Sequence, residues 1–265
     1  MKIRATRILL LMALPLFLLI ASCQKKIQGE EVTPVGAPSP VELRFKGIYD
    51  RLSNLKYDSV YSHNEPIDTL GFHFIKFTTL KYYISNMAFV NDDGDTIKIP
   101  DTYFLIDHSK PELSRALLTV PAGSYYGMSF MLGVDSARSL NGPRTGALDP
   151  ALNMFWNPTD GYVHGMIEGF RGTTPLPNEK FSFRVGGYRA PYSTLARRHF
   201  KLGGNALVSP NRKVVINITT DAVNWFRGNR APFATMPIID GPGPQAQKLS
   251  QNYYAMFTFV SVTYE

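Results

Sequence analysis

The sequence has a single cysteine, Cys23, among its 265 residues. One cysteine cannot form an internal disulfide, and it excludes a metal site built from several thiolates. The familiar catalytic patterns are also missing: there is no Gly-x-Ser-x-Gly elbow, His-Glu-x-x-His pair, phosphate-binding loop or Cys-x-x-Cys pair. The five histidines, at positions 63, 73, 108, 164 and 199, are not paired at metal-ligand spacing. We therefore expect a protein that is not an enzyme.

Residues 23–265 also contain no long run of charges of one sign. The formal net charge is +7, and Lys2, Arg4 and Arg7 lie in a stretch, residues 1–22, that contains no acid. The remainder carries 7 − 3 = +4, with its basic residues scattered and no basic helix or RNA-binding motif. We expect no nucleic-acid partner.

No apolar run is long enough to span a membrane comfortably. Residues 8–20 form an apolar run of 13 residues, whereas a spanning helix needs about 20. With the positive residues before it, this run is typical of a secretion signal. It ends in Leu19-Ile20-Ala21-Ser22-Cys23, which resembles a bacterial lipoprotein cleavage site. A plain signal peptide with a chance cysteine, or an uncleaved anchor, is the alternative.

The lipoprotein interpretation sets the expected location. Residues 1–22 would be the signal peptide, Cys23 the lipidated residue that anchors the chain to a membrane, and residues 23–40 a flexible tether rich in proline and glycine. Gln24, where an aspartate would retain a lipoprotein at the inner membrane, favours the outer membrane of a bacterial cell envelope, on its periplasmic or surface face.

The rest of the chain alternates apolar and polar residues with the period of β-strands. We expect strands at residues 41–46, 96–99, 103–107, 116–120, 125–134, 161–170, 180–185, 213–219 and 257–262, and two strands within 70–90. Residues 135–153 are expected to be an ordered surface loop with a helical turn near 149–153, and residues 188–212 are mixed in pattern. Residues 222–226 and 249–256 are expected to be short helices. This pattern predicts an all-β fold, a single antiparallel β-sandwich domain over residues 41–265 with long loops and one or two short helices.

The densest group of candidate ligands lies in residues 154–170, where Tyr162, His164 and Met166 would share one face of a strand. Imidazole and thioether groups suit copper, so His164 is a candidate metal ligand, and His73 and His108 are the others. The alternative is that methionine and tryptophan fill a β core and that His164 is an ordinary polar residue.

Two further patterns have simpler interpretations. Asn91-Asp92-Asp93-Gly94-Asp95 is acidic but lacks the downstream glutamate of a calcium-binding EF-hand loop, so it predicts a hairpin turn. Exposed aromatic residues next to Asp or Asn can stack on sugars, and Trp156 with Asp160 and Tyr162, or Tyr188 with Tyr192, could form such a surface. A glycan- or protein-binding surface module without a metal is therefore the alternative function.

Six segments in order resemble one protein family. They are Lys81-Tyr82-Tyr83-Ile84-Ser85-Asn86, Leu105-Ile106-Asp107, the run from Val120-Pro121-Ala122-Gly123 to Gly133-Val134-Asp135, the set Met154, Trp156, Gly161, Tyr162, Glu168 and Gly169, then Phe181 to Gly187, and Ala255-Met256-Phe257. Each is weak alone, but together and in this order they resemble the MbnP-like family.

The resemblance implies a β-sandwich outside the cytoplasm, with copper as the cofactor. It also implies a di-haem cytochrome-peroxidase-like partner, which oxidises a tryptophan to kynurenine so that this residue and histidines bind the metal. The chain departs from that pattern, because Arg184 stands where many relatives have histidine, the loop at 241–244 has no histidine, and no tryptophan precedes Trp156. The fold and the signature residues therefore carry over, whereas the copper ligands do not carry over residue by residue.

Overall fold

The computed structural model describes residues 36–51, 53–64, 67, 72–142, 144–227 and 235–265. The predicted signal peptide, Cys23 and residues 24–35 of the predicted tether lie outside these residues. Within the part of the chain that is described, no helix is both long and apolar enough to cross a membrane.

Fifteen strands and six short helices make up the described chain. The strands are β1 (Pro38–Tyr49), β2 (Ser53–Asn54), β3 (Val60–Ser62), β4 (Phe74–Asn91), β5 (Thr96–Lys98), β6 (Tyr103–Asp107), β7 (Arg115–Pro121), β8 (Gly123–Leu132), β9 (Phe155–Asn157), β10 (Gly161–Gly172), β11 (Glu179–Gly186), β12 (Ala196–Val208), β13 (Val214–Asp221), β14 (Ile238–Asp240) and β15 (Phe257–Tyr264). The helices are η1 (Pro111–Leu113), α1 (Ser136–Asn141), η2 (Gly146–Leu148), η3 (Pro150–Leu152), η4 (Ala222–Trp225) and α2 (Pro244–Tyr254).

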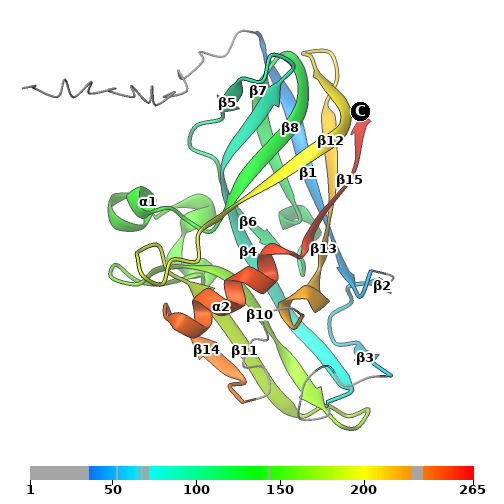
Figure 1. Cartoon of the computed structure of the whole chain (residues 1–265), viewed down its shortest axis with the longest axis vertical. Helices are drawn as coiled ribbons and strands as arrows, with labels where there is room; N and C mark the ends of the chain where they lie inside the picture. Colours follow the sequence, from blue (N-terminus) through cyan, green and yellow to red (C-terminus); the bar gives the residue numbers. More distant parts are fainter. Residues whose placement is uncertain (1–35, 52, 65–66, 68–71, 143, 228–234) are drawn as a thin grey trace, which may run out of the picture. The chain divides into compact units, whose positions relative to one another are not determined.

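The strands form two sheets, and the predicted all-β sandwich is confirmed (Figure 1). The first sheet has the order β15-β13-β1-β2, with β7 also paired to β1. The second has ten strands, with β12-β8-β4-β10-β11-β14 as its main path. The pairing is mostly antiparallel, but β1 with β13 and β11 with β14 are parallel. We call the two sheets the five-stranded and the ten-stranded sheet.

Strand β4 is the spine of the ten-stranded sheet. Along one edge it pairs first with β10 and then with β8, and along the other it pairs with β3, β6 and β5 in turn. The transfer from β10 to β8 falls between Tyr82, which pairs with Gly165, and Ile84, which pairs with Leu132. At this point the sheet forks, and His164 lies beside the fork.

The main core lies between the two sheets and is rich in aromatic rings. Phe45 on β1, Tyr82 on β4 and Phe257 on β15 meet edge to face at centroid distances of 5.2 to 6.4 Å. Beyond the five-stranded sheet, η4 and α2 cover the same face of β10 and β11, with Trp225 stacked on Tyr253 at 4.8 Å (Figure 1). Burial of these large apolar surfaces is the main stabilising contribution to the fold.

The sequence prediction of individual elements differs from the structure in four places. Residues 70–90 were predicted as two strands, but β4 is continuous from Phe74 to Asn91. No strand was predicted within 188–212, which contains β12. The predicted loop at 135–153 contains α1, in addition to the helical turn predicted near 149–153, which is η3. The first strand begins at Pro38, within the predicted tether, and not at 41. The short helices predicted near 222–226 and 249–256 are present as η4 and α2.

Candidate functional site

The signature residues of the 154–170 segment each have a structural task. Met154 and Tyr162 are fully buried in a second apolar cluster, built on the side of the ten-stranded sheet that faces away from the main core. The cluster also contains Tyr83, Leu105, Val134, Leu148, Val163 and Met166. The Tyr162 hydroxyl donates to the Leu148 carbonyl at 3.0 Å and ties η2 to β10. The predicted scaffold role fits these contacts.

Glycines of the same segment mark close approaches. Gly161 has φ +77, and a Cβ there would lie 2.8 Å from the Tyr188 ring. A Cβ at Gly169 would lie 2.0 Å from the Lys76 carbonyl oxygen, at a bulge in the β10–β4 ladder. Next to it, Glu168 accepts hydrogen bonds from Thr79 at 3.2 Å and Ser182 at 2.7 Å. It thereby links the strands on both sides of β10.

Trp156 is the signature residue closest to the surface. Its Nε1 donates to an Asp240 carboxylate oxygen at 2.6 Å, which joins β9 to β14. Its ring lies against Gly186, where an added Cβ would come within 2.6 Å. Arg184 lies 3.5 Å from the same Asp240 oxygen. The residue that replaces a family histidine therefore forms an ion pair here.

His164 is fully buried at the fork beside β4. Its ring lies against Gly133, where a Cβ would come within 2.5 Å, and its Nδ1 is 2.8 Å from the Thr194 hydroxyl. Its Nε2 is buried and has no hydrogen-bond partner of ordinary geometry. Burial lowers the pKa of His164 to about 4, and the Val134 carbonyl offsets part of this fall. The His164 imidazole is therefore neutral at neutral pH.

His108 also has a neutral, internally bonded imidazole. Its Nε2 is 3.1 Å from the Tyr82 hydroxyl, which in turn lies 2.8 Å from the Thr220 hydroxyl. Burial lowers the pKa of His108 to about 4, although Asp107 acts in the opposite direction. His108 lies against Tyr82, which is in the main core, whereas His164 lies against Gly133 and Thr194, so the two histidines have different surroundings.

Two histidines do lie side by side, and only one of them was predicted. His63 and His73 face each other just beyond the β3–β4 ladder, with His63 N–H donating to the His73 carbonyl at 2.9 Å. The Nδ1 of His73 lies 3.0 Å from the His63 carbonyl oxygen. The Nε2 of His63 is hydrogen-bonded to the Tyr49 hydroxyl. Burial is the main cause of the lowered pKa of His63.

The described residues contain no group of three or more His, Cys, Asp or Glu side chains close enough to hold a metal ion. The three predicted ligands, His73, His108 and His164, are not brought together. The histidine that lies beside His73 is His63, which was not predicted. The pair could have been predicted only from the strand register that sets residue 62 opposite residue 74. Nine residues separate the two histidines in the sequence, so no local pattern indicates that they are neighbours.

The aromatic surface considered for sugar stacking is not assembled at the predicted residues. Tyr162 is fully buried, Tyr188 is 7% exposed, and the Trp156 ring edge is engaged with Asp240. Tyr192 is exposed at 42%. One exposed ring does not form the contiguous aromatic platform that sugar stacking needs.

Comparison with known proteins identifies the family. A family model described as MbnP matches residues 38–240, which is 203 of the 265 residues. The chain belongs to the MbnP family. The resemblance found in the six sequence segments is thereby confirmed. Among solved structures, MbnP from Methylosinus trichosporium is similar at 15% identity and a TM-score of 0.44, over 68% of this chain and 76% of that chain. No curated protein sequence matches the chain.

Proposed function

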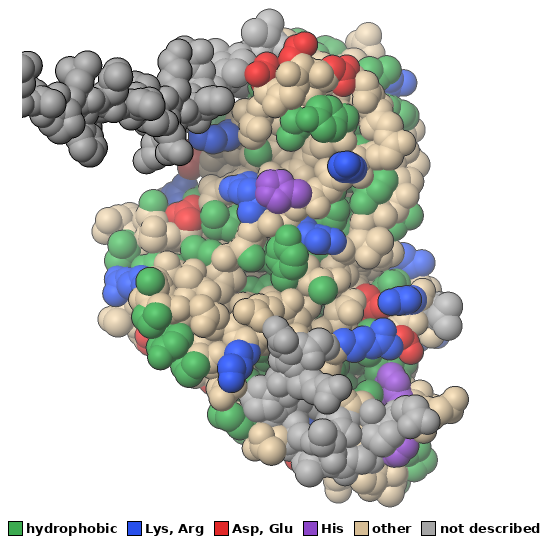
Figure 2. Space-filling view, in the orientation of Figure 1, with side chains coloured by type: hydrophobic (Ala, Val, Ile, Leu, Met, Phe, Trp, Pro, Cys, Tyr) green, Lys and Arg blue, Asp and Glu red, His purple; other side chains and the backbone are tan. Residues whose placement is uncertain are grey.

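We propose that this chain is a lipid-anchored, extracytoplasmic copper-handling protein of the MbnP family and is not itself an enzyme. The observation that carries the proposal is the family match over residues 38–240. The lipoprotein-like sequence ending at Cys23 supports the bacterial cell envelope, with the outer membrane favoured by Gln24, as its location. On the face drawn in Figure 2, Lys and Arg side chains are scattered among the others, so a nucleic-acid partner forms no part of the proposal.

The residues best placed to hold copper are His63 and His73. Imidazole nitrogens are good ligands for both oxidation states of copper, and these two rings come from facing positions of neighbouring strands. The lowered pKa of His63 favours the neutral form that a metal requires. His108 and His164 fit the metal less well, because each is bonded singly within the fold, whereas His63 and His73 lie side by side.

The family resemblance also brings a di-haem partner into the proposal. Of the two tryptophans, Trp156 is the one that such a partner can touch, because Trp225 is fully buried under α2. Trp156 also lies beside Arg184 and Asp240, a charged pair near the surface. The partner would therefore dock over β9 and β14.

Copper retention tests the assignment of the ligands. The purified full chain is mixed with Cu(I) or Cu(II), desalted, and its copper measured. We expect about one equivalent in the native chain and less than about 0.1 equivalent after His63→Ala with His73→Ala, because the metal loses both imidazoles. His199→Ala removes an exposed histidine on β12 and should change nothing.

Two results would contradict the proposal. If the native chain retains less than about 0.1 equivalent, the unmodified protein does not hold copper in the way described. If the double variant retains as much copper as the native chain, the ligands lie elsewhere. If the double variant has lost its β-sheet circular dichroism, the single variants His63→Gln and His73→Gln replace it in the same assay.

A further inference from the structure

The outer face of the five-stranded sheet carries a groove that the family match does not explain. Its volume is about 740 Å³, and it runs over β1, β13 and β15 toward the segment around η1. Pockets for organic ligands have volumes of roughly 300–1,000 Å³. The groove is therefore large enough for a small organic molecule and not only for an inorganic ion. We call it the β1 groove.

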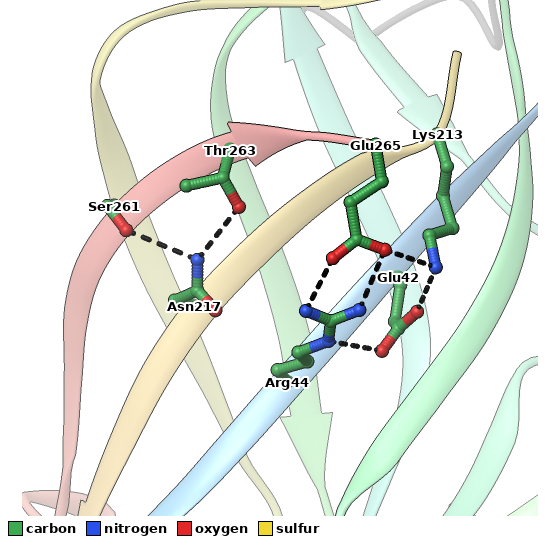
Figure 3. Close-up of polar contacts among 7 residues, drawn as sticks. All are labelled: Glu42, Arg44, Lys213, Asn217, Ser261, Thr263 and Glu265. Atoms are coloured by element: carbon green, nitrogen blue, oxygen red, sulfur yellow. Dashed lines mark hydrogen bonds and ion pairs between the residues drawn. The ribbon is translucent and has the colours of Figure 1, made fainter.

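A closed ring of four charges stands at one end of the β1 groove (Figure 3). Arg44 contacts Glu42 at 2.5 Å and Glu265 at 2.7 Å, and Lys213 contacts both carboxylates at 2.8 Å. The Glu42 side chain is only 1% exposed beneath the two cations. Two positive and two negative charges cancel, so this ring contributes no net charge to the groove.

Two further cations line the β1 groove and are not balanced. Arg115 is the direct partner of Arg44 across the β1–β7 ladder, and Lys46 lies two residues beyond Arg44 on β1. Arg115 and Lys46 are exposed, and neither has an acidic partner within the described chain. Diagonal neighbours in such a ladder are about 7–8 Å apart, within reach of long side chains. Like charges facing each other are unfavourable, and an anion between them would relieve the repulsion.

The remainder of the β1 groove supplies neutral hydrogen-bonding groups and apolar walls. Asn217 donates to the hydroxyls of Ser261 at 3.2 Å and Thr263 at 3.3 Å, which leaves each hydroxyl proton available (Figure 3). At the floor, Gly47 leaves His108 accessible, since a Cβ there would lie 3.0 Å from its Nδ1. Apolar contact comes from Leu55, Pro111 and Val260.

We propose that the β1 groove binds a small organic anion, a phosphate- or carboxylate-bearing molecule, with Arg115 and Lys46 holding the anionic group. The Ser261 hydroxyl donates to the polar part of the ligand, and the apolar walls cover the rest. Arg44 does not release its two carboxylates and serves to fix the sheet under the ligand. A neutral glycan is a poorer occupant, because Phe45 is the single aromatic residue in the lining and it is buried.

Titration calorimetry on the full chain tests this site with three probes. Inorganic phosphate carries the anionic group alone, glucose 6-phosphate adds a soluble polar body, and dihexanoyl phosphatidylglycerol below its micelle concentration adds a lipid headgroup with short chains. We expect at least one organic probe to bind about tenfold more tightly than inorganic phosphate, because only it fills the groove. The tighter organic probe identifies the source as a soluble molecule or a lipid headgroup.

Charge-matched variants locate the binding. Lys46→Gln with Arg115→Gln should weaken the organic probe at least about tenfold, the effect of losing charge-assisted hydrogen bonds. Lys180→Gln with Lys201→Gln removes two exposed cations from β11 and β12 and should leave the affinity unchanged. The proposal is overturned if no probe binds at about 10 mM, a concentration at which even weak binding is measurable. It is also overturned if both double variants weaken binding equally. Copper retention is independent of these residues, so failure here leaves the copper proposal standing.

Discussion

The outer faces of the two sheets differ in whether other elements of the chain cover them. Outside the ten-stranded sheet, a second apolar cluster around Tyr83, Met154 and Tyr162 is covered by α1, η2, η3 and β9, and His164 is buried neutral at its side. Outside the five-stranded sheet the described residues form no such cover, and the face carries the ring of Glu42, Arg44, Lys213 and Glu265.

This difference can be compared with the positions of the family's signature residues. In the 154–170 segment, the signature residues Met154 and Tyr162 lie in the covered cluster, and Tyr162 fixes η2 onto β10. Signature residues of other segments, such as Phe181 and Phe257, lie in the main core instead. The open face holds the unbalanced cations Lys46 and Arg115. A scaffold built from the covered face leaves the open face free to differ in charge and in ligand.

The largest expected effect comes from emptying the covered cluster. Tyr162→Ala should lower the free energy of unfolding by about 3–5 kcal/mol, because a fully buried ring is replaced by a cavity and its hydrogen bond to Leu148 is lost. Leu117→Ala removes an apolar side chain that is 59% exposed on the open face and should change stability by less than about 0.5 kcal/mol. Urea denaturation followed by fluorescence measures both. Equal effects would show that the two faces do not differ as described.

The second effect is a pH dependence that belongs to the covered face. Burial lowers the pKa of His164 from 6.5 to about 4. Below pH 6.5 the His164 imidazole is protonated in the unfolded chain but stays neutral in the folded chain. The contribution of His164 to the free energy of unfolding therefore falls as the pH drops from 6.5 to about 4, and it is constant above that window. His164→Gln should remove about 3 kcal/mol of this fall. The measurement is the unfolding free energy at pH 7 and 4.5, with His199→Gln as control. Parallel pH curves for His164→Gln and the native chain would contradict the burial argument.

Sequence periodicity predicted the fold class because most strands keep one alternation phase along their length. It divided β4 wrongly because the buried residues shift from Ile75 and Phe77 to Leu80 and Tyr82. That shift is a bulge opposite Gly169, where the ladder passes from Thr79 to Phe77, and not a turn. Strand β12 was missed for a similar reason, since Gly203, Gly204 and Asn205 form an irregularity between its two paired halves.

The candidate site was less predictable, because it depends on pairing between distant strands. Alternation correctly placed Tyr162 and Met166 in one cluster, but it could not show that the opposite side of β10 is buried as well. The pairing of His63 with His73 follows from the β3–β4 register. The adjacency of Arg44 and Arg115 follows from the register of β1 with β7, across a separation of 71 residues that no local pattern encodes.

The smallest effect tests the open face in a different pH window. Burial raises the pKa of Glu42, but hydrogen bonds from Arg44 and Lys213 outweigh it and the net pKa is lowered. Hydrogen bonds from the same cations lower the pKa of Glu265 to about 2. For a lowered carboxyl pKa, the stabilisation is present above the unfolded value of 4.5 and is lost as pH falls toward 2.

Glu42→Gln should therefore cost about 1 kcal/mol of unfolding free energy at pH 7, the scale of one charge-assisted hydrogen bond discounted for the exposed Arg44. The cost should become smaller as the pH falls below the unfolded value of 4.5, because the folded carboxyl then begins to take up a proton too, and it should shrink in high salt. Glu112→Gln, an exposed acid on η1, is the matched control. A cost that does not change with pH or salt would mean that Glu42 acts through packing. The open face would then be stabilised by side-chain packing, like the covered face. The contrast between an ionic face and an apolar face would not hold.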